Sequence, residues 1–316
     1  MNKLSFTKGV CAVALGAVLA LGTLPATAFA VATETGPDPD QWNSDTYSPA
    51  CALTDEHAPF AEKYGVAMNH VKLDDKYRCT DQDVTFDHDE MIWDRYLIET
   101  GHVTFNILPG VTVELPHGIT VGEDAHFYVT GGGTLLVNGL SHESSDWNGF
   151  AGIGADADHT KSGDIHFDNV TVYAEGGPFA AGIGGTAYDK SGEIYIERFA
   201  NVTAVGGTHA AGIGGGWCGE AGVIDIKGTV NAKGGFHTVD SYDCSAKTNA
   251  EYNAPAIGSG NFFHGMLGQN VYDIRLESGA NVTAQQPNHR LVQAIGAGFN
   301  AKDGFLTPGA NVTIAE

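Results

Sequence analysis

A four-residue motif, Ala-Gly-Ile-Gly, returns at fixed intervals and sets the strongest limit on how this chain can fold. It begins at Ala151, Ala181 and Ala211, thirty residues apart, and shortened copies follow at Ala256–Gly258 and Ala294–Gly296. A fixed period of this size is typical of repeat architectures, in which each unit buries its apolar face only against its neighbours. The repeat therefore predicts a solenoid.

Two alternating runs follow the motif and predict what kind of solenoid it is. In the first run, apolar residues alternate with charged or polar ones: Ile165 and Phe167, Ile194 and Ile196, Ile224 and Ile226, Ile274 and Leu276. The second run repeats in the same way: Val170 and Val172, Val202 and Ala204, Val230 and Ala232, Val282 and Ala284, Val312 and Ile314. Period-two alternation without a helical pattern is typical of short strands with one buried face. We therefore predict an all-β parallel β-helix of about seven coils, in which these apolar residues face inward.

Asparagine and glycine recur at fixed places in the repeats. Asparagine precedes the inward valine at Asn169, Asn201, Asn281 and Asn311, and Thr229 takes its place in the third unit. Stacked asparagines can hydrogen-bond their copies one coil away, and asparagine tolerates left-handed backbone. We expect the motif glycines to occupy tight corners with positive φ, where a side chain would clash.

The chain divides into a leader, a cap and the repeats. A basic start, a short apolar run and the small-x-small sequence Ala28–Ala30 predict a signal peptide over residues 1–30, because the run is short for a membrane span. Residues 31–101 are predicted to form a leader and an N-terminal cap, which the exposed end of a solenoid needs. The β-helix is predicted over residues 102–316, with an insertion at 236–255.

The net charge of the chain and its predicted export limit the kinds of partner that it can bind. The chain has 38 acidic and 16 basic residues and a formal net charge of −22. Such a charge opposes binding to nucleic acid or to an anionic membrane. No second apolar run of spanning length follows the signal peptide, so we expect no membrane insertion. The predicted location is extracellular, either secreted or associated with the cell surface.

Four cysteines follow the signal peptide, and an even number in an exported chain favours disulfides over a metal site. The local pairing, Cys51–Cys79 and Cys218–Cys244, is the one we expect among three possibilities. A zinc site is the alternative, but no Cys-x-x-Cys or His-x-x-x-His spacing supports it.

The repeats resemble those of a known group of proteins. Ala181–Gly185 and Ala211–Gly216, with Gly-x-Ile-x-Ile and Asn-Val-Thr-Ala between copies, resemble exported proteins of Gram-positive bacteria with Ala-Gly-Ile-Gly-Gly repeats. They are loosely similar to the Gly-Gly-Ala-Ile repeats of polymorphic adhesins. The resemblance covers about residues 103–316. It implies a right-handed parallel β-helix and a secreted or cell-surface, adhesin-like or carbohydrate-associated role. It carries over no catalytic residue.

Carboxylates after the motif are candidates for catalysis. Asp156, Asp158 and Asp164 follow the first copy, and Asp189 lies in the corresponding loop of the next coil. A glycosidase needs two carboxylates that face one groove, about 5–10 Å apart. The alternative is a solvated acidic loop in a protein that is acidic throughout, and we favour that interpretation.

The same loop suggests two weaker hypotheses. Asp156, Asp158 and Asp164, with Thr160 and Ser162 between them, place oxygen donors at every second residue, as calcium loops often do. The segment lacks the glycine and the terminal glutamate of an EF-hand, so Ca²⁺ is a weak candidate and no other cofactor is expected. A polysaccharide lyase would also need a base, for which Lys161 and Lys190 are available, but the acidic surface would repel polyuronate.

Three aromatic residues near the motif are candidates for glycan binding. Trp147 and Trp217 flank two copies, and Tyr188 lies in the loop of the second coil. Exposed rings in a row could stack on sugar faces. The alternative is that they cover the edges of the coils.

The sequence favours a non-catalytic, adhesin-like protein that binds a glycan, or a host or cell-surface protein, through its loops. A β-helix carbohydrate-active enzyme, either a glycosidase or a polysaccharide lyase, is the first alternative. A self-assembling structural protein is the second, because the last predicted strand, Val312–Ile314, could offer a free edge for self-association.

Overall fold

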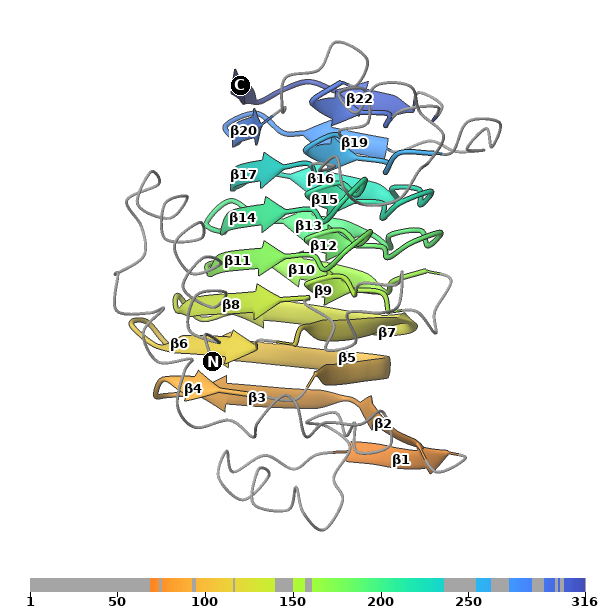
Figure 1. The fold of residues 1–316 in the computed structure, drawn as a ribbon. Coiled ribbons are helices and arrows are strands. Elements are labelled where there is room, and N and C mark those ends of the chain that lie inside the picture. The colour runs from red at the N-terminus through yellow and green to blue at the C-terminus, as the bar shows by residue number, and fades with distance from the viewer. Residues whose placement is uncertain are drawn as a thin grey trace, which may run out of the picture. The chain divides into compact units, whose positions relative to one another are not determined.

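The computed structural model describes residues 69–73, 76–92, 95–115, 117–139, 150–156, 161–235, 254–262, 273–285, 293–298, 301 and 304–315. Every regular element in these residues is a β-strand, and most of them stack in coils along one axis (Figure 1). Several predicted features lie outside the described residues: the signal peptide, Cys51, Trp147, Asp158, Cys244 and most of the insertion at 236–255.

Each of the later coils has three strands. The first side carries the Ile-Gly pair of the motif: β9 (Ile153–Gly154), β12 (Ile183–Gly184), β15 (Ile213–Gly214), β18 (Ile257–Gly258) and β21 (Ile295–Gly296). The second side follows: β10 (Asp164–Phe167), β13 (Ile194–Ile196), β16 (Val223–Ile226), β19 (Asp273–Leu276) and β22 (Phe305–Thr307). The third side completes the coil: β11 (Thr171–Glu175), β14 (Asn201–Val205), β17 (Thr229–Lys233), β20 (Asn281–Gln285) and β23 (Asn311–Ala315).

The earlier part of the chain has longer strands. An antiparallel hairpin, β1 (Asn69–Leu73) with β2 (Lys76–Thr80), precedes the coils in the region predicted to be the cap. The first coils follow: β3 (Gln82–Phe86), β4 (Glu90–Met91), β5 (Tyr96–Ile107), β6 (Thr112–Leu115), β7 (Ile119–Thr130) and β8 (Thr134–Asn138). β7 spans two sides at once, since Ile119 pairs with Ile153 of β9 and Phe127 pairs with Ile165 of β10.

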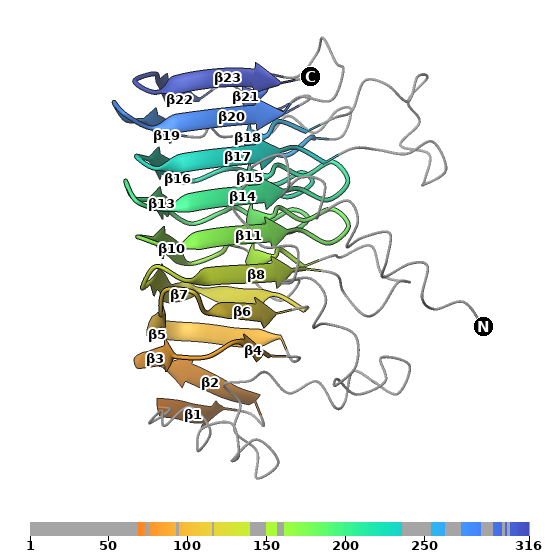
Figure 2. The ribbon, with the colours of Figure 1, turned by 90° about the vertical axis from the view of Figure 1, so that its left-hand side faces the viewer.

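Each strand of the coils pairs in parallel with its counterpart one coil away. On the third side, for example, Val172 pairs with Val202, which in turn pairs with Val230. The result is a stack of equivalent strands in register (Figure 2). The fold is therefore the predicted all-β parallel β-helix.

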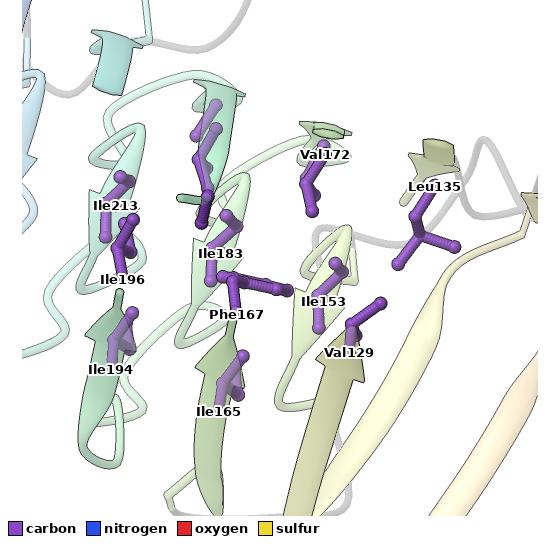
Figure 3. Close-up of a cluster of buried hydrophobic side chains, with 14 of the residues drawn as sticks. Val129, Leu135, Ile153, Ile165, Phe167, Val172, Ile183, Ile194, Ile196 and Ile213 are labelled. Atoms are coloured by element: carbon purple, nitrogen blue, oxygen red, sulfur yellow. The ribbon is translucent and has the colours of Figure 1, made fainter. Parts of the chain in front are cut away.

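The core runs along the axis of the stack. The inward positions predicted for the first alternating run, from Ile165 to Leu276, are at most 2% exposed. Figure 3 shows isoleucine, valine and leucine side chains from neighbouring coils meeting in the interior. Near the N-terminal end, aromatic rings fill the same column: Phe105 lies edge to face with Phe86 and with Phe127, at 5.0 Å between centroids in each case. Each coil thus buries its apolar face against its neighbours, as a repeat architecture requires.

The coils begin earlier than we predicted. β3 pairs in parallel with β5 from Gln82 with Val103 to Phe86 with Ile107. Residues 82–92 and 95–101, assigned from sequence to the cap region, therefore already belong to the β-helix. These first coils lack the Ala-Gly-Ile-Gly motif, so only the alternation of Val84 and Phe86 with polar neighbours marks them in the sequence.

The asparagine row also differs from expectation in one unit. Asn201 pairs with Thr171, not with Asn169, which has a φ of +47° and lies outside the strand. Val172 is consequently the valine that pairs with Val202, although Val170 is buried too, and the sequence alignment of this repeat was two residues out of register. At the C-terminal end the row does form as predicted: the Asn311 side-chain amide donates to Asn281 Oδ1 at 3.2 Å.

The motif itself forms a short strand, whereas we expected a corner. Its isoleucine points inward, and Ile153, Ile183 and Ile213 are all fully buried. Its second glycine has a φ between +129° and +144° in each copy. The predicted need for glycine is thus confirmed at this second position, where a Cβ atom would also lie between 1.9 and 2.1 Å from a backbone carbonyl oxygen of the next coil in Gly154, Gly184 and Gly214.

Glu114→Gln is expected to remove a pH-dependent loss of stability. Glu114 lies on β6 beside Leu136, and burial raises its pKa from 4.5 to about 7. A carboxyl whose pKa is raised by folding contributes fully below the unfolded pKa, and this contribution is lost as pH rises through the folded pKa. At about 1.4 kcal/mol per pKa unit, the loss is about 3 kcal/mol and is complete above about pH 7.

Urea unfolding at pH 5 and pH 8 measures this loss. The free energy of unfolding should fall less between the two pH values in Glu114→Gln than in the wild type, by about 2.5 kcal/mol, because a part of the loss already occurs below pH 5. Glu277→Gln, at an exposed position, is the matched control and should follow the wild type. Identical pH dependence in wild type and Glu114→Gln would contradict the assignment.

Candidate functional site

A row of aromatic rings runs along the outside of the second side of the coils. It is formed by His102, His126, Tyr128, His166 and Tyr195, which we call the ladder face. These residues occupy outward positions because side chains on a strand alternate between the two faces, and their strand neighbours fill the core. Parallel register then places residues from β5, β7, β10 and β13 side by side.

The rings stack on one another. His166 lies between Tyr128, at 4.3 Å and 14°, and Tyr195, at 4.4 Å and 15°. His102 stacks on His126 at 4.8 Å and on Tyr128 at 5.1 Å. Because the ring faces cover one another, the ladder presents ring edges, nitrogen atoms and hydroxyl groups to solvent. Such a surface suits hydrogen bonding better than stacking against the face of a sugar.

Carboxylates flank the rings on the same face. Asp164 Oδ2 lies 3.2 Å from His126 Nδ1, and Asp164 Oδ1 accepts a hydrogen bond from the backbone N–H of Glu193 at 3.0 Å. The Tyr195 hydroxyl donates to Glu193 Oε2. One coil further, Lys227 pairs with Glu197 at 2.9 Å. The face therefore offers acceptors and donors in alternation.

Protonation states on the ladder face follow from these contacts. Burial, more than any neighbouring charge, lowers the pKa of His166, so its imidazole favours the neutral form. The hydrogen bond to Glu193 raises the pKa of Tyr195 to about 12, which keeps its hydroxyl protonated at neutral pH. At neutral pH His166 and Tyr195 thus favour their uncharged forms, and carboxyl side chains lie beside them.

The row continues with charged residues. Asp225 pairs in register with Tyr195, and Arg275 pairs with Asp225. Burial raises the pKa of Asp225, and within the described residues its Oδ1 atom is buried without a hydrogen-bond partner. Arg275 pairs with Asp273 on its own strand. Asp225 therefore continues the row beyond the last ring, with one of its carboxyl oxygens covered.

The loop aromatic residues that were predicted from the sequence as candidates for glycan binding form a separate cluster. Tyr188 and Trp217 come together as expected, with ring centroids 5.2 Å apart. Trp217 is only 6% exposed because Phe179 also packs on it at 5.0 Å, whereas Tyr188 is 55% exposed. Trp217 is thus a support for Tyr188 and does not present a free face to a sugar. Tyr188 remains a candidate.

The carboxylates that were predicted from the sequence as candidates for catalysis lie in different surroundings. Asp156 is 9% exposed, and its Oδ2 atom accepts a hydrogen bond from Thr120 at 3.0 Å. Thr120 in turn accepts from the buried Arg95 at 2.6 Å. Asp164 belongs to the ladder face, and Asp189 is 8% exposed in the loop before Lys190. Asp156 thus belongs to a buried polar network, which favours a structural role over catalysis.

The other loop predictions have mixed outcomes. Lys161 and Lys190 do occupy equivalent positions, joined by a parallel bridge. Among the described residues, no three His, Cys, Asp or Glu side chains come together as a possible metal site. Since Asp158 lies outside them, the calcium hypothesis stays a prediction. Cys218 is 7% exposed, and its pairing with Cys244 also stays a prediction.

Comparisons with known proteins do not assign this chain to a family. No protein-family model matches this chain, and neither a curated protein nor a solved structure does. The described residues contain no helix with the length and hydropathy of a membrane span. Function is therefore inferred from the side chains themselves.

Sequence reasoning missed the ladder face, although a signal for it exists. The triplets His126-x-Tyr128, Asp164-x-His166 and Glu193-x-Tyr195 place ring and acidic residues at alternating outward positions. Aligning the outward positions of successive coils, as we did for the inward ones, would have brought these rings into one row.

Proposed function

We propose that this chain is an exported, non-catalytic, adhesin-like β-helix that binds a linear glycan along its ladder face. The observation that carries the proposal is the Tyr128–His166–Tyr195 stack, bordered by Asp164, Glu193 and Asp225. Protein carboxylates, hydroxyl groups and imidazoles are the acceptors and donors that sugar hydroxyl groups require. Here they stand in rows that repeat once per coil.

The repeat distance supports a polymer as ligand. Adjacent strands in a sheet lie about 4.8 Å apart, which is comparable with the length of one sugar ring in an extended chain. A glycan lying along the axis would therefore meet a similar set of polar groups at each ring. The acidic border favours neutral or amino sugars over uronates. Binding without catalysis is favoured because Asp156, the first candidate acid, belongs to the buried network of Arg95.

The test is binding of the purified protein to immobilised linear neutral, amino-sugar and uronate polysaccharides. Tyr195→Phe keeps the ring stack and removes the hydroxyl group. A hydrogen bond is worth about 1–1.5 kcal/mol, so we expect the Kd to rise roughly tenfold. Tyr188→Phe, which removes a hydroxyl group from the loop cluster, is the matched control and should bind like the wild type.

Three results would count against the proposal. Absence of binding to every polysaccharide would remove it. Loss of affinity in Tyr188→Phe but not in Tyr195→Phe would move the site to the loops. Release of reducing ends or of unsaturated products would favour the enzyme alternative, and sensitivity of that release to Asp164→Asn would place catalysis on the ladder face.

A further inference from the structure

The last coil leaves core positions open to solvent. β21 and β22 stand at the two ends of one sheet and β23 at the end of the other, so each is bonded to a described strand on one side only. Leu306 and Val312 are each 41% exposed and Ile314 is 52% exposed. Their counterparts one coil earlier, Ile274, Val282 and Ala284, are at most 1% exposed.

The opposite end of the solenoid is different. On β3 and after β4, the inward side chains Val84, Phe86 and Ile92 are at most 4% exposed. β4 has only two residues, of which Glu90 is acidic, and Asp89 precedes it. Short, charged edge strands with covered side chains discourage pairing with another chain. Among the described residues, the C-terminal end therefore combines an open sheet edge with exposed apolar side chains, and the coil end at β3 and β4 does not.

The backbone of β23 is oriented to accept another strand. The N–H of Asn311 donates to the carbonyl of Ala280 at 3.0 Å, toward β20. Because neighbouring residues of a strand direct their N–H groups to opposite sides, Val312 and Ile314 direct theirs away from β20. β23 sits at the top of the stack in Figure 2, next to β20.

Charge indicates what kind of partner fits this edge. The strands β21, β22 and β23 contain no charged residue, although the chain has a net charge of −22. An uncharged edge does not select a charged ligand, and it is where two acidic copies can approach with least repulsion. A second copy also carries the same apolar surface, so each open core end can cover the other.

We propose that two copies of this chain associate end to end through their C-terminal coils, with β23 antiparallel to its copy across a two-fold axis. The contact is isologous, because each copy contributes the same strand, and it closes at two chains. A head-to-tail contact would need an open N-terminal end, which the buried side chains of β3 do not provide. The proposal goes beyond glycan binding and places two ladder faces in one assembly.

The test is the mass of the full chain by light scattering over a wide concentration range. The wild type should change from one chain to two as concentration rises. Ile314→Pro removes an N–H that makes no bond within the chain, and proline is tolerated on edge strands. We expect this variant to remain a single chain at concentrations at least tenfold above the wild-type midpoint. Ile314→Lys, which keeps the N–H but adds a charge, should act in the same direction.

Ile314→Val keeps both the N–H and an apolar side chain, so it is the matched control and should dimerise like the wild type. Thermal unfolding of all variants separates loss of pairing from loss of fold. A wild type that stays a single chain at every concentration overturns the proposal, and so does a folded Ile314→Pro that still dimerises. Growth beyond two chains would indicate open-ended assembly instead. Glycan affinity of the Ile314→Pro monomer tests the binding proposal separately.

Discussion

Gly184→Ala is expected to cost at least about 4 kcal/mol of the free energy of unfolding, which is exceptional for the addition of one methyl group. Gly184 has a φ of +131°, and a Cβ atom there would lie 2.1 Å from the carbonyl oxygen of Gly214 in the next coil. The obstacle is backbone on a paired strand, which cannot move without breaking the register of β12 and β15. Urea unfolding measures the loss.

Gly279→Ala is the control that separates the strain of a positive φ from a steric clash between Cβ and the next coil. Gly279 also has a positive φ, of +94°, but nothing lies within 4 Å of the position its Cβ would take. An alanine there carries only the conformational penalty, about 1–2 kcal/mol. Equal losses in the two variants would show that conformation alone demands glycine and that the close approach of the coils has little effect.

Arg95→Met is expected to lower the free energy of unfolding by about 3–5 kcal/mol, because it leaves several buried polar groups unsatisfied at once. Arg95 is 1% exposed. Its guanidinium donates to Thr120 Oγ1 at 2.6 Å, to the His117 carbonyl at 2.8 Å and to the Ala151 carbonyl at 3.3 Å. It also lies 4.5 Å from the centre of the Phe150 ring.

Arg198→Met is the matched control, since Arg198 is exposed in the turn after β13, and a change within about 0.5 kcal/mol is expected there. Asp156→Asn should weaken the same network by a smaller amount, because the amide oxygen still accepts from Thr120. A loss below about 1 kcal/mol in Arg95→Met would contradict a stabilising role for the network. Unfolding by urea, followed by circular dichroism, is the measurement for all three variants.

Much of the fold could be predicted from the sequence, and for a physical reason. A side chain on a strand faces the core or the solvent according to a period of two, so local alternation identified Ile165, Ile194 and Ile224 as inward residues. The thirty-residue spacing of Ala151, Ala181 and Ala211 required that successive units repeat one conformation. Both signals can be read directly along the chain, and together they predict the class of fold and most of its core.

The candidate site was predicted less well, because it depends on register between coils. Whether Asn169 or Thr171 pairs with Asn201 depends on how many residues the intervening turns use, and Asn169 turns the chain with a positive φ before the strand begins. A slip in register between coils regroups every outward row. The row from His102 to Tyr195 was missed for a different reason: its members are separated by whole coils, and only the inward positions of successive coils were aligned.

The sequence by itself thus determined the β-helix, its repeat and the residues that fill its core, since alternation and period can both be read along the chain without knowing which residues meet. Only the tertiary structure decided that Trp217 is buried beneath Tyr188, that Asp156 joins Arg95 in a buried network, and that histidine and tyrosine edges form one face. These outcomes depend on contacts between residues that are far apart in the chain, and stacking of the coils alone brings them together.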